Sequence, residues 1–161
     1  MQGESRRLNL HKQTWSAFIG HPDLEPNMSE AHEKQDPVAV LEAISHQGPV
    51  DVLNQLKFRE TAKYPDELAM PACSGKEAFR RYSESLPPVL EKIGGSVKIW
   101  HGKVLAELAP GHGESWDVML VFQFQSVNAL IRLFNDPDFH SVHVHRAAAI
   151  EHSRTFVCRP E

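Results

Sequence analysis

The histidines near the end of the chain are the side chains best suited to acid–base or metal chemistry. His140 and His143 are three residues apart, a spacing that would place both on one face of a helix and let them share a ligand. A zinc ion needs a third or fourth ligand from another element, and the sequence identifies none. We therefore predict no metal and no cofactor, and keep haem or metal binding as an alternative. The other histidines of this group are His145 and His152.

Arg146 and His145 are the candidates for anion binding and proton transfer. Arg146 shares a predicted helical face with apolar residues, so its guanidinium would be partly buried and would need a partner. That partner is either internal (Asp117, Glu151 or a strand end) or the carboxylate of a ligand, which a guanidinium binds with two parallel hydrogen bonds. Histidine titrates near neutral pH, and of His145 and His101 we choose His145 as the proton carrier.

Five further residues are predicted ligand contacts: Asn54, Lys57, Arg59, Trp100 and Trp116. Asn54 is the polar member of an otherwise apolar strand face, so its amide either fixes a neighbouring loop or orients a ligand. Lys57 and Arg59 lie on the opposite face, which we place toward the interior of a barrel; their alternative is a solvated strand end. With the two tryptophans they would line an apolar cleft that holds a few polar groups, the usual form of a small-molecule site.

Composition excludes several classes of protein. A net charge of -4 with scattered basic residues does not match a nucleic-acid-binding surface. The N-terminus lacks the apolar core of a signal peptide, and the longest apolar run, 118–122, is too short to span a membrane. Cys73 and Cys158 have no metal-binding spacing, so we expect a cytoplasmic protein. Motifs of serine hydrolases, P-loop ATPases, zinc proteases and dithiol enzymes are absent from the sequence.

The elements that must position these residues follow from hydrophobic periodicity. Alternating apolar residues over 116–124 predict a strand at the centre of a sheet, and further strands are expected over 50–59, 97–108 (with a bulge at Gly102) and 155–158. Helices are expected after the N-caps Asp36, Ser74, Ser126 and Asp136, and Pro87–Pro88 should kink or restart the second of them.

This order of elements predicts an α+β fold. From residue 50 it reads strand, helix, strand, strand, helix, helix, strand, which is the pattern of a ferredoxin-like α/β sandwich with an antiparallel sheet. Both long helices should cover one face, which leaves Leu53, Met119 and Val121 on the other. An exposed apolar face of this kind marks an interaction site, so we predict a homodimer with the two sheets face to face. Residues 37–161 would form this domain, and residues 1–36 a polar, partly ordered arm with one apolar cluster around Trp15.

The chain also resembles a known family. The resemblance is carried by Gly48–Arg59, Ser74–Phe79, Gly94–Gly95, Trp116–Asp117, Asp136–Phe139, His145–Arg146 and Ser153–Arg154. In combination these segments resemble the bacterial domain-of-unknown-function family thirteen-thirty. The resemblance implies the dimeric α/β-barrel superfamily, and it brings no established reaction. Relatives in that superfamily include cofactor-independent monooxygenases, isomerases and haem-handling enzymes.

The functional expectation joins these observations. We expect a homodimer that binds a small organic anion in a cleft between sheet and helices. Arg146 and Lys57 would hold the anion, Asn54 would orient it, and His145 would serve an isomerase or monooxygenase that needs no cofactor. The alternative is a non-catalytic structural or ligand-sensing dimer.

Overall fold

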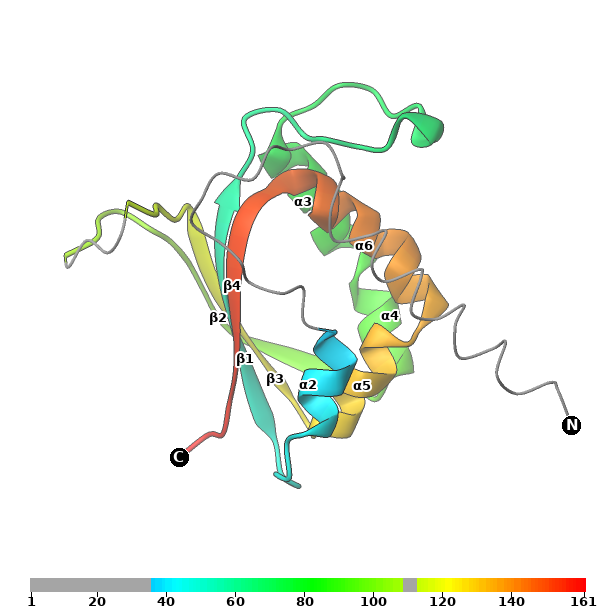
Figure 1. Ribbon diagram of the computed structural model, residues 1–161, viewed down its shortest axis with the longest axis vertical. Coiled ribbons are helices and arrows are strands. Elements are labelled where there is room, and N and C mark those ends of the chain that lie inside the picture. The colour runs from blue at the N-terminus through cyan, green and yellow to red at the C-terminus, as the bar shows by residue number, and fades with distance from the viewer. Residues whose placement is uncertain (1–35, 109–112) are drawn as a thin grey trace, which may run out of the picture.

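The computed structural model describes residues 36–108 and 113–161, and it places an antiparallel four-stranded sheet against a layer of helices (Figure 1). The strands are β1 (Val50–Phe58), β2 (Ser96–Lys103), β3 (Val118–Phe124) and β4 (Ile150–Cys158), in the spatial order β2-β3-β1-β4. The helices are α2 (Pro37–Glu42), α3 (Gly75–Ser85), α4 (Pro87–Lys92), α5 (Val127–Phe134) and α6 (Pro137–Ala149), with a short 3-10 turn, η1 (Asp66–Leu68).

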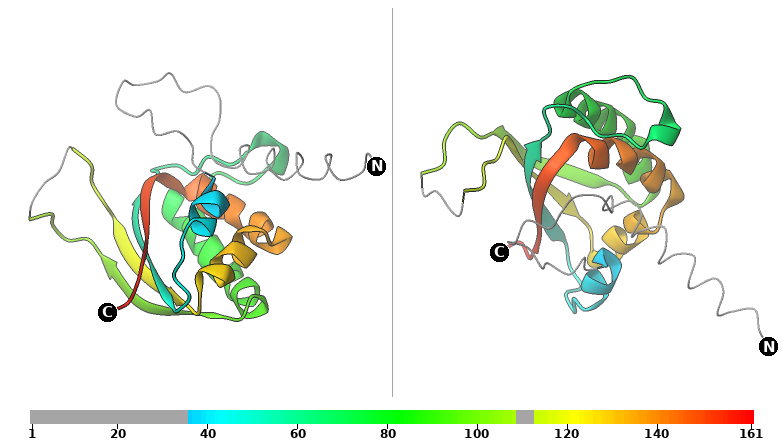
Figure 2. Two further views of the ribbon diagram at one scale, coloured as in Figure 1. Left: turned by 60° about the horizontal axis from the view of Figure 1, so that its bottom comes forward. Right: turned by 45° about the horizontal axis from the view of Figure 1, so that its top comes forward.

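The predicted ferredoxin-like α+β fold is confirmed. The labelled helices lie on one side of the sheet, and the two turned views in Figure 2 show the same arrangement. The strand over 118–124 lies between β2 and β1, so the central place predicted for it is correct. We call the helix-covered side of the sheet the inner face and the other side the outer face.

Alternation along the strands fills the inner face with core residues. Val52 and Leu56 of β1 and Leu120 and Phe124 of β3 are buried there. Their strand neighbours point to the outer face, because successive side chains of a strand alternate. The helix layer contributes buried apolar residues to the same core, among them Val89, Leu90, Leu130, Leu133 and Phe139.

Helix boundaries follow the predicted capping residues. The side chains of Asp36, Ser74, Ser126 and Asp136 each accept a hydrogen bond from a backbone N–H in the first turn of the helix that follows. Such caps satisfy donors that have no partner within the helix. The chain restarts a helix at Pro87 rather than continuing α3 through it.

Three predictions about strands are wrong. The register of β2 shifts between Lys98 and Trp100, not at Gly102. Gly102 instead lies under the Trp100 indole, since a Cβ at residue 102 would be 2.6 Å from ring atoms. β2 ends at Lys103, earlier than predicted. β4 begins at Ile150, earlier than predicted, because it pairs with β1 along its length although its early residues lack an apolar alternation.

Part of the sequence-based interpretation lies outside the described residues. Of the N-terminal arm predicted over residues 1–36, residues 1–35, with the cluster around Trp15, are outside the described part of the chain. Within residues 36–108 and 113–161, no helix is both long and apolar enough to cross a membrane.

Candidate functional site

Arg146 is the residue around which the candidate site is built. It lies on α6, which packs against α3, and only part of its surface is exposed. Burial lowers the pKa of Arg146, and the charge interaction with the Tyr82 phenol on α3 opposes this effect. The guanidinium therefore occupies an environment that disfavours its own positive charge.

No carboxylate compensates that charge in the part of the chain that the structure describes. Arg146 makes no hydrogen bond and no ion pair with residues 36–108 or 113–161. The internal partners considered from the sequence do not pair with Arg146: Asp117 lies 3.4 Å from Lys57 Nζ and accepts a 2.8 Å hydrogen bond from Phe58 N, and Glu151 is exposed. The interpretation of Arg146 as half of an internal ion pair is therefore wrong for these residues.

Two neighbours complete what we call the Arg146 cluster: Tyr82, His143 and Arg146. Burial raises the pKa of Tyr82, so its hydroxyl stays protonated and can donate a hydrogen bond; that hydroxyl has no acceptor among the described residues. His143 is buried, and this burial, together with the charge of Arg146, lowers the pKa of His143 to about 3. The imidazole is therefore neutral at physiological pH.

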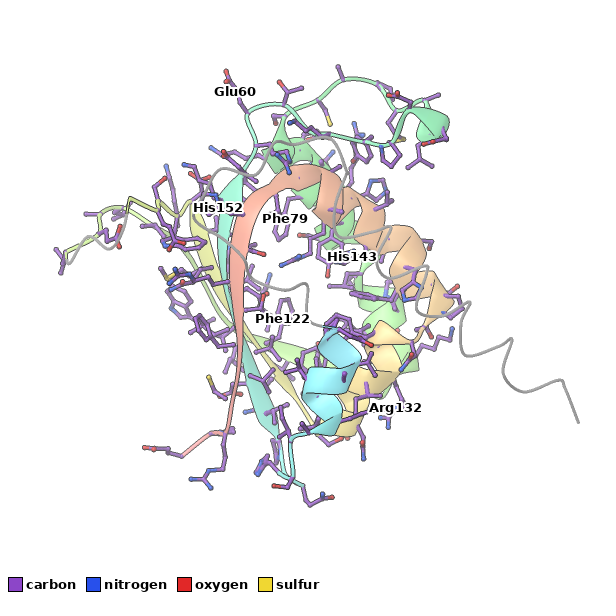
Figure 3. The ribbon with its side chains drawn as sticks, viewed as in Figure 1. Glu60, Phe79, Phe122, Arg132, His143 and His152 are labelled. Atoms are coloured by element: carbon purple, nitrogen blue, oxygen red, sulfur yellow. The ribbon has the colours of Figure 1, made fainter. Side chains whose placement is uncertain are left out.

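Aromatic rings surround the cluster. The centroids of Tyr82 and His143 are 6.4 Å apart with perpendicular planes. Phe79 lies 5.7 Å from Tyr82, and Phe139 lies 5.2 Å from His143. Figure 3 shows Phe79, Phe122 and His143 between the sheet and the helices. Tyr82 and His143, the two neighbours of Arg146 in the cluster, are thus packed among aromatic rings.

His145, the predicted proton carrier, belongs to a different cluster. Its Nδ1 lies 2.8 Å from the Tyr64 hydroxyl, which the loop between β1 and α3 brings against α6. Burial and the nearby Arg81 lower the pKa of His145. Arg81 also ion-pairs with Glu77 at 3.6 Å. Although His145 and Arg146 are adjacent in sequence, the structure does not bring them to one site.

Asn54 lies on the inner face, as predicted, and its amide is used within the sheet. Its Oδ1 accepts a 3.1 Å hydrogen bond from the Thr155 hydroxyl on β4. Its Nδ2 donates to the Val52 carbonyl oxygen at 3.3 Å. The amide therefore links β1 to β4 and does not fix a loop.

The other predicted contacts lie away from Arg146. Lys57 is on the outer face, paired with Asp117, so Lys57 and Arg146 do not hold one ligand within a single protomer. Arg59 follows the end of β1, where its backbone bonds to Ala149 and Gly75. The Arg59 Nε is buried without a hydrogen-bond acceptor among the described residues.

Both tryptophans also belong to the outer face or its rim. Trp100 is 53% exposed on β2. Trp116 precedes β3 and lines a half-open hollow of about 410 Å³. The Arg154 guanidinium lies 5.9 Å from the centre of the Trp116 ring and ion-pairs with Glu114 at 2.7 Å. The predicted ligand contacts are thus divided between two faces of the sheet.

The histidines do not form a metal site in the described part of the chain. No group of three or more His, Cys, Asp and Glu side chains is placed there to hold an ion. His140 Nε2 lies 2.7 Å from the Phe134 carbonyl oxygen. His143 is buried among aromatic rings.

Tyr82 and His143 are the members of the cluster that sequence reasoning did not select. Tyr82 lies at helical spacing from Phe79 and Leu86, which is the pattern of a core position, and His143 was considered only with His140 as part of a shared ligand site. A usable signal was present in Tyr82, since a phenol on a buried helical stripe carries a hydroxyl that needs a partner.

Comparison with known proteins places this geometry in a family. No family model matches the chain, and no curated protein matches it. Among solved structures, the RPA0582 protein of unknown function from Rhodopseudomonas palustris is 30% identical with a TM-score of 0.70, and the match covers 80% of this chain and 95% of that one. The chain belongs to the same family as that protein.

Two further structures are similar. The methylated RPA0582 protein is 29% identical with a TM-score of 0.70, over 89% of this chain and 96% of that chain. A dimeric protein of unknown function and ferredoxin-like fold from Bacteroides fragilis is 19% identical with a TM-score of 0.45, over 69% of this chain and 95% of that chain. These relatives identify no reaction.

Proposed function

We propose that the protein binds a small organic carboxylate at the Arg146 cluster. The observation that carries the proposal is the half-buried Arg146 guanidinium, which has no acidic partner among the described residues. A buried charge without a counter-charge is strongly unfavourable, so a buried arginine normally has an acidic partner, and a ligand carboxylate would supply that partner here. A carboxylate would accept two parallel hydrogen bonds from the guanidinium and a third from the protonated Tyr82 hydroxyl.

Binding, rather than catalysis, is the function that this geometry supports best. A general base works best with a pKa near the operating pH, and His143, with a pKa of about 3, is far from it. His145 is bonded to Tyr64 in the neighbouring cluster. The role of His145 in an isomerase or monooxygenase therefore stays a separate prediction. Loss of turnover in a His145→Gln variant would support it.

We also propose that two copies of the chain pair through their outer faces. Leu53, Met119 and Val121 lie side by side there, and Trp100 and Phe156 on the flanking strands are 53% and 46% exposed. The dimeric α/β-barrel arrangement implied by the resemblance to family thirteen-thirty has this geometry, and residues 37–161 would form the paired domain.

The test of the carboxylate site is a thermal-shift and calorimetric titration of the full chain with acetate, hexanoate, benzoate and cyclohexanecarboxylate. A ligand at 100 times its Kd would stabilise the wild type by about 2.7 kcal/mol. Arg146→Met should lose this stabilisation. Arg80→Met is the matched control, because Arg80 lies on the exposed side of α3 in ion pairs with Glu77 and Glu84.

The same variant tests the physical premise without a ligand. Replacing an uncompensated half-buried cation by an apolar side chain of similar length should raise the stability of the unliganded protein by roughly 1–3 kcal/mol. A loss of stability in Arg146→Met, with no carboxylate shifting the Tm of the wild type, would show that Arg146 has a purely structural role.

A further inference from the structure

We infer that the carboxylate recognised by the Arg146 cluster belongs to a planar aromatic acid. This inference rests on the proposed carboxylate site and narrows its ligand class. It is carried by the arrangement of aromatic rings on both sides of the cluster.

The rings form a continuous series from the sheet through the helix layer. Phe58 of β1 lies 5.2 Å from Phe79 of α3, and Phe79 lies 5.7 Å from Tyr82. Tyr82 is followed by His143 at 6.4 Å, and His143 by Phe139 at 5.2 Å. The planes are tilted or perpendicular at each step. Arg146 follows His143 by three residues on α6, which places both on one side of the helix, and its charge acts on Tyr82 and His143 alike.

Ring geometry of this kind favours a flat aromatic partner over an aliphatic one. Aromatic rings have negative faces and positive edges, so tilted and edge-to-face contacts attract each other beyond the simple burial of apolar area. A ligand ring beside Tyr82 and Phe79 would continue the series, while its carboxylate reached Arg146. A saturated ring of the same size and charge would bury similar area without the ring-to-ring attraction.

The accessible surface of the cluster allows a ligand to make a ring contact and a carboxylate contact together. Tyr82 and Arg146 each keep part of their surface accessible although they lie in the helix layer. Their polar groups have no partner among the described residues, so a ligand carboxylate would not need to displace an internal hydrogen bond. An aromatic acid would supply both a carboxylate for the polar groups and a ring for the aromatic side chains. It is one rigid molecule, so it loses little conformational freedom on binding.

The deciding experiment compares benzoate with cyclohexanecarboxylate by isothermal titration calorimetry on the full chain. We expect benzoate to bind the wild type at least about fivefold more tightly, the factor that one or two aromatic contacts provide. Phe79→Leu should remove most of this preference and keep carboxylate binding. Phe156→Leu is the control, because Phe156 lies on the outer face, on the side of the sheet opposite the cluster, and leucine keeps an apolar side chain there for the proposed pairing; the preference should be unchanged.

The possible results distinguish the aromatic ligand class from the carboxylate site on which it rests. Equal affinity for the two acids, with both lost in Arg146→Met, would overturn the aromatic class and leave the carboxylate site standing. Binding of neither acid, nor of acetate or hexanoate, would overturn both. If Phe79→Leu fails to fold by circular dichroism, the wild-type ratio of the two affinities alone decides.

Discussion

His143 shows how one buried side chain makes the stability of the whole protein depend on pH. Burial lowers the pKa of His143 to about 3, from an ordinary value of 6.5. The unfolded chain therefore takes up the proton before the folded chain does. The contribution of His143 to stability is fully present above pH 6.5 and is lost progressively as pH falls from 6.5 to 3.

A His143→Phe variant should remove this dependence. At pH 5 the wild type should have lost roughly 2 kcal/mol through His143, because each pH unit below the unfolded pKa is worth about 1.36 kcal/mol. Urea unfolding at pH 7.5 and pH 5 would measure the difference. His101→Phe, at an exposed position on β2, should keep the wild-type dependence of stability on pH. If the unfolding free energy changed equally with pH in both variants, His143 would not be the source of the dependence.

Sequence patterns predicted where Arg146 lies but not what surrounds it. Its partial burial followed from helical spacing alone. Its missing acidic partner could not be predicted, because pairing depends on contacts between segments far apart in the chain. The hydrogen bond between Tyr64 and His145, 81 residues apart, is another contact of this kind. Lys57 was predicted to join Arg146, although the alternation along β1 places Lys57 on the face opposite Asn54 and the helices.

At the scale of the elements, Asp136 connects two helices. Its carboxylate caps α6 by accepting hydrogen bonds from Asp138 N at 2.8 Å and Phe139 N at 3.3 Å. It also lies 2.8 Å from the Lys92 ammonium at the end of α4. The hydrogen bonds to Lys92 and to these backbone groups hold the pKa of Asp136 below its usual value.

Replacing Asp136 should therefore weaken the start of α6. Asp136→Ala removes the cap and should destabilise the protein by about 1–2 kcal/mol. Asp136→Asn keeps an oxygen that can accept the capping bonds and should be milder. Asp138→Asn, at an exposed residue that contacts the same lysine, is the control and should change stability by less than about 0.5 kcal/mol in urea unfolding. An equal effect at both positions would show that the ion pair, not the cap, matters.

Helix starts were easier to predict than strand details, for a physical reason. A cap is a local interaction between residues two or three apart, so the sequence alone predicts it at Ser74, Ser126 and Asp136. The register shift between Lys98 and Trp100 depends on how β2 meets β3, and the early start of β4 depends on β1. Pairing with a distant strand overrides the weak propensity of a polar segment.

At the scale of the whole molecule, the outer face gives the prediction about assembly. Val121→Asp would place a charge among Leu53, Met119 and Trp100, and it should convert a dimer into a monomer in light scattering coupled to size-exclusion chromatography. Leu68→Asp, at a residue 45% exposed on η1, should leave the dimer intact. A wild-type monomer at micromolar concentration would contradict the face-to-face arrangement.

The pairing of β1 with β4 has a consequence for how the chain folds during synthesis. β1 is the first strand of the described sheet to be made and β4 the last, and Asp51 is aligned with Cys158. Until β4 leaves the ribosome, one edge of β1 has unpaired backbone groups. Such an edge can pair with strands of other unfinished chains. Chaperone protection should therefore matter most late in translation, and a ribosome stalled before Ile150 should present a chain that aggregates rather than one that folds.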